Sequence, residues 1–184
     1  MIRLAAAPDF AAIAAITNHY IRTTAIHFGS EDVTAEELRS SWSEQLETYP
    51  WLVHLDADGT VLAYAKSGTW RSRAAYRWTT ETGIYVRVDR CGRGLGLPLY
   101  RRLLTVLQAQ GFHGAIGGIA LPNAASVRLH ERLGFVPTGV VPRAGRKFDR
   151  WHDVGFWHLA LQPHDAAPAA LRTPDAAFAA TRGS

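Results

Sequence analysis

The stretch from Glu81 to Leu104 places a glycine-rich loop between an apolar strand-like segment and a helix-like segment. The loop contains Gly92, Gly94 and Gly96, together with several arginines. The N-terminus of a helix carries unpaired N–H groups and a partial positive charge, and glycines let a phosphate approach those groups closely. The stretch therefore predicts a binding site for a phosphorylated ligand.

Charge and composition exclude several classes of partner. The chain has 184 residues and a formal net charge of +4, which suits one domain with a full core and anionic small-molecule ligands. It has neither a long Lys/Arg run nor the pattern of an RNA-binding sheet, and no apolar run has the length of a membrane span. A single cysteine, Cys91, excludes an intramolecular disulfide framework. With no signal-peptide pattern at the start, we expect a cytoplasmic protein.

Hydrophobic spacing, capping patterns and turns predict the order of elements. Strands are expected over 2–6, 51–55, 60–66, 77–88, 112–121, 135–141 and 151–161, and helices from Pro8, from Thr34 to Pro50, over 99–110 and over 124–133. The strand–helix–strand unit over 84–121 implies a parallel strand pair with a right-handed crossover. We expect residues 1–162 to form one domain and the Ala- and Pro-rich residues 163–184 to form a disordered tail.

The spacing of the loop separates it from two common phosphate-binding loops. A dinucleotide fingerprint requires a third glycine where this chain has Leu97, and a Walker loop requires a Gly-Lys-Ser/Thr sequence that is absent. Pro98 is tolerated only in the first turn of a helix, where its missing N–H would have no partner. The helix must therefore begin close to Leu95, which places residues 92–97 around the anion.

Two motifs in this order resemble the GNAT superfamily of N-acetyltransferases. The strand, glycine loop and helix resemble its coenzyme A loop, and N-A-A-S-V-R-L-H-E-R-L-G-F over 123–135 is similar to its second conserved helix. Stretches at 18–21, 49–53, 70–81 and 151–157 resemble the phosphinothricin N-acetyltransferase group, and the likeness runs from Ile2 to Leu161. The resemblance implies a mixed α/β (α+β) fold, in which helices flank a central, mostly antiparallel sheet with one splayed parallel pair.

The resemblance also implies acetyl-CoA as co-substrate and gives its binding residues. The backbone of the strand before the loop is expected to pair with the pantetheine arm, and the loop N–H groups are expected to hold the pyrophosphate. Asn123 either caps a helix or lies near the pantetheine arm. The expected coenzyme-binding residues are Ile84, Tyr85, Val86, Gly92, Arg93, Gly94, Leu95, Gly96, Leu97 and Asn123. Cys91 departs from the Gln or Arg that usually begins the motif, so Arg90 or Arg93 is expected to supply the charge.

Glu81 and His130 are the expected catalytic residues. Glu81 lies in a strand of mostly uncharged residues, where desolvation raises the proton affinity of a carboxylate, and it matches the base position of the phosphinothricin group. The pattern alone slightly favours an ordinary strand-edge glutamate on a solvated face. His130 stands where many superfamily members carry a tyrosine acid, so it could protonate the departing thiolate. The alternative is a histidine on a helix surface.

The acceptor is expected to be a small amino acid with an acidic side chain, such as phosphinothricin, or one of its mimics, methionine sulfone and methionine sulfoximine. Arg71, Arg73 and Tyr76 lie before the Glu81 strand, where arginine forks match carboxylates and phosphinates, and Phe28 could form a wall of the site. Two alternatives are an acetyltransferase for polyamines or aminoglycosides and a non-catalytic acyl-CoA-binding domain.

The histidines show no metal-ligand spacing, so no metal is expected. The resemblance suggests a homodimer and a role in antibiotic or herbicide resistance.

Overall fold

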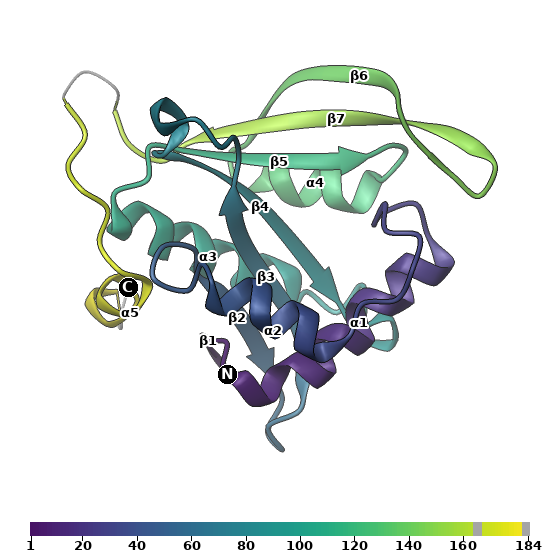
Figure 1. The fold of residues 1–184 in the computed structure, drawn as a ribbon, viewed down its shortest axis with the longest axis horizontal. Helices are drawn as coiled ribbons and strands as arrows, with labels where there is room; N and C mark the ends of the chain where they lie inside the picture. Colours follow the sequence, from purple (N-terminus) through teal and green to yellow (C-terminus); the bar gives the residue numbers. More distant parts are fainter. Residues whose placement is uncertain (164–166, 182–184) are drawn as a thin grey trace.

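The computed structural model describes residues 1–163 and 167–181 as a seven-stranded sheet with helices on both faces (Figure 1). The strand order is β1-β2-β3-β4-β5-β7-β6. The strands are β1 (Ile2–Leu4), β2 (Trp51–Leu55), β3 (Val61–Thr69), β4 (Thr79–Val86), β5 (Gly114–Ala120), β6 (Val136–Lys147) and β7 (Arg150–Ala160). The helices are α1 (Phe10–Thr23), α2 (Ala35–Ser43), α3 (Gly96–Gln110), α4 (Ala124–Arg132) and α5 (Pro174–Ala180), with short 3₁₀ turns at Ala7–Asp9, Ala74–Tyr76 and Val88–Arg90.

One pair of neighbouring strands is parallel, and it pairs over only part of its length. β4 and β5 pair from Thr79 opposite Gly114 to Thr82 opposite Gly117, and every other pair in the sheet is antiparallel. Beyond that point β4 continues to Val86 and β5 to Ala120 without pairing to each other. The expected mostly antiparallel sheet with a splayed parallel pair is therefore confirmed.

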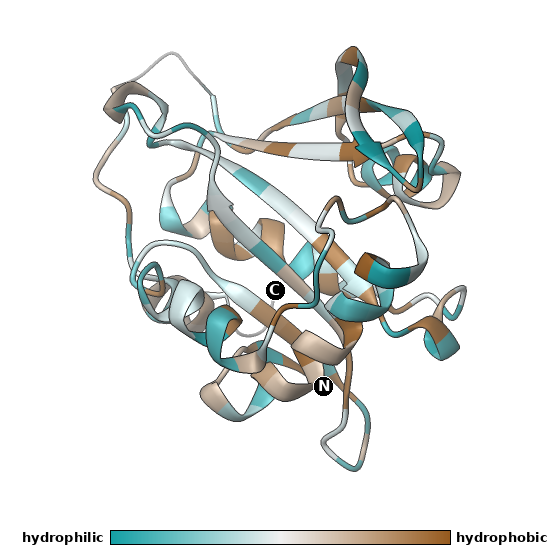
Figure 2. Cartoon of the chain, turned by 45° about the vertical axis from the view of Figure 1, so that its right-hand side comes forward, coloured by the Kyte–Doolittle hydropathy of each residue, from teal (hydrophilic) through white to brown (hydrophobic). Residues whose placement is uncertain are grey.

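Two hydrophobic clusters fix the helices on opposite faces of the sheet. On one face, Phe10, Ile13 and Ile16 of α1 pack on Trp51 and Tyr64, and α2 lies beside α1. On the other face, α3 buries Leu99, Tyr100, Leu103, Leu104, Val106 and Leu107. Hydrophobic residues are concentrated in the central strands and in the helix turns that face them (Figure 2). The sheet thus presents one side of β4 to α3 and the other side to α1 and α2.

Helix boundaries agree with the local sequence signals. The Thr34 hydroxyl accepts from the N–H of Glu37, and the Glu37 carboxylate accepts from the N–H of Thr34, so the capping box that starts α2 is confirmed. Leu95 is the N-cap of α3 and Pro98 lies in its first turn, as the proline requires. The apolar spacing predicted a start at residue 99, which is three residues late. The start close to Leu95 predicted from Pro98 is confirmed.

The last two strands form an arm that is longer than expected. β6 was predicted to end at Val141 but continues to Lys147, with an irregularity between Val141 and Gly145. Arg143 there adopts a positive φ of 51°, and its N–H donates to the Asp153 carboxylate at 2.8 Å. The arm is exposed along most of β6, and near its tip the Lys147 ammonium donates to the carbonyls of Ile21 in α1 and of His27.

The prediction of a disordered tail is wrong for residues 167–181. Thr173 caps α5, and Ala177 and Phe178 are buried in the cluster around α3. The Arg102 guanidinium donates to the carbonyls of Phe178 at 3.0 Å and Thr181 at 2.6 Å. The Ala/Pro-rich composition suggested too little apolar surface, but Ala177, Phe178 and Leu171 pack on the cluster around α3, and together with these hydrogen bonds they dock the segment. Residues 164–166 and 182–184 of that prediction lie outside the described residues.

Candidate active site

The glycine loop adopts a conformation that requires glycine at two positions. Gly92 has a φ of 74° and Gly94 a φ of 78°, in the left-handed region that L side chains disfavour by about 1–2 kcal/mol. These two turns bring the chain into the N-terminus of α3 at Gly96. The loop can therefore present backbone N–H groups and the positive end of a helix to an anion.

A cavity of about 780 Å³ lies against this loop. Ile84 and Val86 from β4 and Asn123 from the start of α4 form its sides, and Tyr20 of α1 reaches it from the other face. Loop residues complete the lining at Arg90, Cys91, Gly92, Gly94, Leu95, Gly96 and Leu97. The cavity thus combines an apolar wall with an anion-binding end, as a pantetheine arm with a pyrophosphate requires.

Two of the expected coenzyme-binding residues have side chains outside this cavity. Arg93 is exposed and does not line this cavity, whereas Arg90 does, together with Arg128 of α4. The Tyr85 side chain points to the opposite side of β4, where it stacks on Tyr64 with ring centroids 5.2 Å apart. Sequence reasoning missed Arg128, although it lies within the second motif.

Asn123 combines the two roles considered for it. Its Oδ1 accepts from the N–H of Ser126 at 3.1 Å and so caps α4, and the residue also lines the coenzyme cavity. A cap satisfies one of the free donors at the start of a helix. Asn123 therefore fixes the position of α4 beside the cavity.

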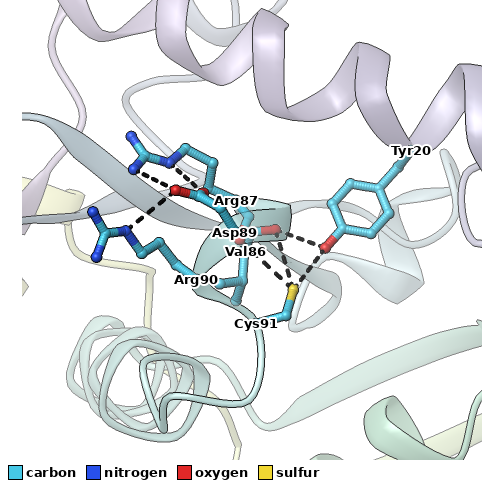
Figure 3. Close-up of polar contacts among 6 residues, drawn as sticks. All are labelled: Tyr20, Val86, Arg87, Asp89, Arg90 and Cys91. Atoms are coloured by element: carbon cyan, nitrogen blue, oxygen red, sulfur yellow. Dashed lines mark hydrogen bonds and ion pairs between the residues drawn. The ribbon is translucent and has the colours of Figure 1, made fainter.

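Cys91, at the motif's unusual position, lies in a small polar cluster (Figure 3). The Tyr20 hydroxyl donates to the Val86 carbonyl at 2.6 Å and lies 3.5 Å from the Cys91 Sγ. Next to it, the Arg87 guanidinium holds Asp89 through two bonds of 2.7 and 2.9 Å (Figure 3). The Tyr20 contacts anchor the end of β4 to α1. Arg90, whose Nε lies 3.4 Å from the Asp89 carboxylate, lines the cavity together with Arg128.

Past Thr82, the edge of β4 that faces β5 has no ladder partner. Residues 83–86 pair only with β3, through Gly83 opposite Lys66 to Val86 opposite Ala63. An extended ligand arm can occupy this gap and bond to the free main-chain groups, as in strand addition. The gap lies between the coenzyme cavity and the strand position of Glu81.

Glu81 lies in a second cavity, of about 450 Å³, on the face of β4 that carries Tyr85. It is opposite Gly68 on β3 and Ile116 on β5. The side chain keeps contact with solvent, but the cavity walls withdraw water from its carboxyl group. That desolvation raises the pKa of Glu81, while the charges of Lys66 and Arg71 act in the opposite direction. A carboxylate with raised proton affinity beside an open cavity is suited to take a proton from an ammonium group.

His130 is buried rather than on a helix surface, with 3% of its area exposed. Its Nδ1–H donates to the Ser126 carbonyl at 2.8 Å, so Nε2 accepts from the Tyr100 hydroxyl at 2.9 Å. Tyr100 in turn lies 2.7 Å from the Thr82 hydroxyl, at the last paired position of β4. Burial lowers the pKa of His130, which favours the neutral ring in this chain of hydrogen bonds.

The four expected substrate-binding residues occupy different places. Arg71 is close enough to Glu81 to affect its pKa, and its guanidinium stacks on Trp70 at 4.3 Å. Arg73 and Tyr76 lie exposed at the 3₁₀ turn before β4. Phe28 packs against His152 of the β6–β7 arm with ring centroids 6.2 Å apart. None of the four lines the Glu81 cavity as the described residues form it.

Sequence reasoning missed Lys66, which does line the Glu81 cavity. Its Nζ lies 4.8 Å from the centre of the Trp51 ring, and burial lowers its pKa. The available signal was a single charged residue inside the apolar run V-L-A-Y-A-K-S of β3. A lone lysine in such a strand has to reach either a partner or a cavity, because an unpaired buried charge is costly.

Two further features bear on ligand class. Within residues 1–163 and 167–181, no three His, Cys, Asp or Glu side chains are grouped so as to hold a metal ion. None of the helices described in those ranges is both long and apolar enough to cross a membrane.

Comparison with known families identifies the class of protein. Residues 2–155 match the family model of the acetyltransferase (GNAT) domain. The chain is a GNAT-superfamily acetyltransferase. It is an acetyl-CoA-dependent N-acetyltransferase. The expected superfamily, fold and co-substrate are confirmed.

Individual relatives of this GNAT acetyltransferase are similar over most of their length. It is 44% identical to a phosphinothricin N-acetyltransferase of Streptomyces viridochromogenes, over 85% of each chain. It is 42% identical to an L-methionine sulfoximine/L-methionine sulfone acetyltransferase of Salmonella typhimurium, over 92% of this chain and 98% of that one. Among solved structures, a Salmonella typhimurium acetyltransferase with acetyl-CoA superposes with a TM-score of 0.87 at 40% identity, covering 92% of this chain and 98% of that chain. A Sinorhizobium meliloti phosphinothricin acetyltransferase with acetyl-CoA superposes with a TM-score of 0.88 at 29% identity, covering 92% of both chains.

Proposed function

We propose that the enzyme acetylates the α-amine of small amino acids of the phosphinothricin and methionine sulfone or sulfoximine type. The observation that carries the proposal is the position of Glu81, in a cavity of its own beside the acetyl-CoA gap, with a raised pKa. Cations at Lys66 and Arg71 act on the same carboxyl group, so the cavity suits an acceptor with an acidic group next to its amine. The names of the relatives agree with this acceptor class.

In the proposed reaction, Glu81 takes a proton from the acceptor ammonium, directly or through a water. The neutral amine nitrogen then attacks the thioester carbonyl, the C–S bond breaks, and coenzyme A leaves as a thiolate that takes up a proton. The free main-chain groups of Ile84–Val86 are suited to hold the pantetheine arm and to polarise the thioester oxygen as negative charge develops there. Glu81 therefore supplies the base and the strand supplies the electrostatic stabilisation.

We propose that His130 is a positioning residue that acts through Tyr100 and does not itself touch the leaving thiolate. Both ring nitrogens of His130 have partners within the protein, and Tyr100 connects the ring to Thr82 at the point where β4 leaves β5. The neutral ring accepts from Tyr100 and so has no proton to pass toward the thiolate, but a fully satisfied buried network holds its members rigidly. The thiolate is proposed to take up the second proton that the acceptor nitrogen loses as the amide forms.

Arg71 is the proposed anchor for the acceptor carboxylate, because its charge already acts on Glu81. Arg73, Tyr76 and Phe28 are proposed to complete the mouth of the site when the acceptor is bound. All four lie in the loop after β3 or in the loop after α1, and loops around a rigid sheet commonly carry such contacts. Arginine also matches carboxylate geometry with two parallel hydrogen bonds.

A substrate panel tests the proposed function. Thiol release from acetyl-CoA is measured with phosphinothricin, methionine sulfone and spermidine as acceptors. We expect turnover with the two amino acids and little or none with the polyamine, because cations at Lys66 and Arg71 repel it. Activity with spermidine alone would contradict the proposal, and tight acetyl-CoA binding without turnover on any amine would indicate a binding domain.

We further propose a cytoplasmic homodimer with a role in resistance to its amino acid substrates. The β6–β7 arm exposes a row of large apolar side chains, at Val136, Val140, Val141, Phe148 and Trp151, the last with 60% of its area exposed. Apolar surface of this kind commonly marks an interface. Light scattering after gel filtration should give twice the monomer mass of 20.2 kDa, and Trp151→Ser should shift the mass toward the monomer. A wild-type monomer would exclude the homodimer.

A further inference from the structure

The Glu81 cavity has a floor made of two glycines between two opposite charges. On β3 and β4, Lys66 is opposite Gly83, and Gly68 is opposite Glu81. Residues opposite each other in a sheet share a face, so all four lie on the side of Tyr64 and Tyr85. A Cβ added at Gly68 would meet no atom of the described residues within 4 Å, so the space above Gly68 is open. Lys66 and Glu81 thus stand at diagonal positions of the ladder, about 7–8 Å apart at their Cα atoms.

Lys66 has no acidic partner in direct contact. Glu81 acts on it at longer range, because no carboxylate oxygen of the described residues lies within 4.0 Å of its Nζ, and the ammonium lies 4.8 Å from the centre of the Trp51 ring. An ammonium over an aromatic ring is stabilised in its charged form. Its three N–H donors remain available to a ligand in the cavity.

The order of the charges along the sheet matches one class of acceptor. Along β3, Gly68 opposite Glu81 falls between Lys66, which lines the cavity, and Arg71, which lies two residues beyond the end of the strand and outside the cavity lining. With the acceptor amine at Glu81 and its α-carboxylate at Arg71, a side chain of two or three carbons extends toward Lys66. We infer that Lys66 binds a second acidic group at the end of the acceptor side chain and selects acidic side chains over neutral ones of the same shape.

This inference rests on the proposed function, and the experiment separates the two. Phosphinothricin, with an anionic phosphinate, and methionine sulfone, with a neutral sulfone, are compared by kcat/KM in the wild type, in Lys66→Met and in Lys66→Arg. Hydrogen bonds to charged groups support an expected fall of about tenfold or more in the phosphinothricin-to-sulfone ratio for Lys66→Met. Lys66→Arg keeps a cation at the site and should retain most of the ratio.

Each outcome has a distinct meaning. A wild type that acetylates neither amino acid contradicts the proposed function itself. If the wild type acetylates both and Lys66→Met leaves the ratio unchanged, the inference alone is overturned. An equal loss for both acceptors also overturns it, because Lys66 would then bind the α-carboxylate that they share. Thermal unfolding of the variants shows whether folding contributes, and the ratio is insensitive to the fraction of active enzyme.

Discussion

Replacing Glu81 by Gln is expected to lower the kcat of amino acid acetylation by about 10²- to 10⁴-fold, the usual effect of losing a general base. The amide keeps the shape of the side chain but cannot take a proton from the acceptor ammonium. The KM for acetyl-CoA should change little, because Glu81 lies in the acceptor cavity and not in the glycine loop. Steady-state kinetics with each substrate varied in turn would measure both parameters.

The pH dependence gives this variant a more specific signature. A base must be deprotonated to act, and burial raises the pKa of Glu81 above its ordinary value. The wild-type kcat/KM should therefore fall as the pH is lowered through that raised pKa. In Glu81→Gln this dependence on the carboxyl group is lost, and activity should depend on the amine's own ionisation. The deficit is expected to be largest between the raised pKa of Glu81 and the pKa of the amine, and smaller both below and above that range.

A matched control uses another glutamate. Glu47 is exposed in the segment after α2, so Glu47→Gln should leave both kcat and the pH profile unchanged. An unaltered pH profile in Glu81→Gln would remove Glu81 as the base. The proton would then have to leave through solvent or through another group of the cavity.

Replacing Phe178 by Ala is expected to destabilise the protein by roughly 3 kcal/mol, the lower end of the range for a buried phenylalanine. Phe178 is 8% exposed, contacts the cluster around α3 and lies 4.3 Å from the Arg102 guanidinium. The lower end of the range applies because α5 is a terminal helix that can detach. The loss in free energy of unfolding therefore cannot exceed the free energy with which α5 packs on the rest of the protein. For a chain of this size, the expected fall in Tm is about 6–12 °C.

Asp175 on the exposed side of α5 provides the control for this change. Asp175→Asn alters only a charge near the helix N-terminus, worth about 0.3–1 kcal/mol. Calorimetry of both variants would show whether the loss of stability comes from the packing of Phe178 or follows from any change in α5. Equal Tm values for Phe178→Ala and the wild type would show that α5 contributes nothing to the stability of the sheet and α3.

Local rules predicted the features that depend on local sequence. Pro98 determined where α3 begins, Thr34 and Glu37 determined where α2 begins, and the strand–helix–strand order determined the parallel pair. Each of these depends on residues within a few positions or on a rule of chain connection. The docking of α5 depends on residues such as Arg102 and Phe178, which are 76 positions apart, so composition alone gave the wrong answer.

The candidate site was predictable in part for the same reason. Glu81 and the glycine loop lie on one continuous stretch, and the structure places them beside the two cavities. The role of Lys66 arises only when β3 pairs with β4 in one register, which sets two glycines between it and Glu81. The burial of His130 likewise depends on Tyr100 of a different helix. The spacing of residues within one strand or helix does not show which residues of another element it will contact.

The splay of β4 from β5 creates an unpaired strand edge in the interior of the sheet. Unpaired edges invite other strands to add and so promote aggregation. Here β5 and Asn123 at the start of α4 flank the opening. An extended ligand bound along this edge would satisfy its free main-chain groups and block strand addition, so amide hydrogen exchange in residues 83–86 should slow when acetyl-CoA binds there.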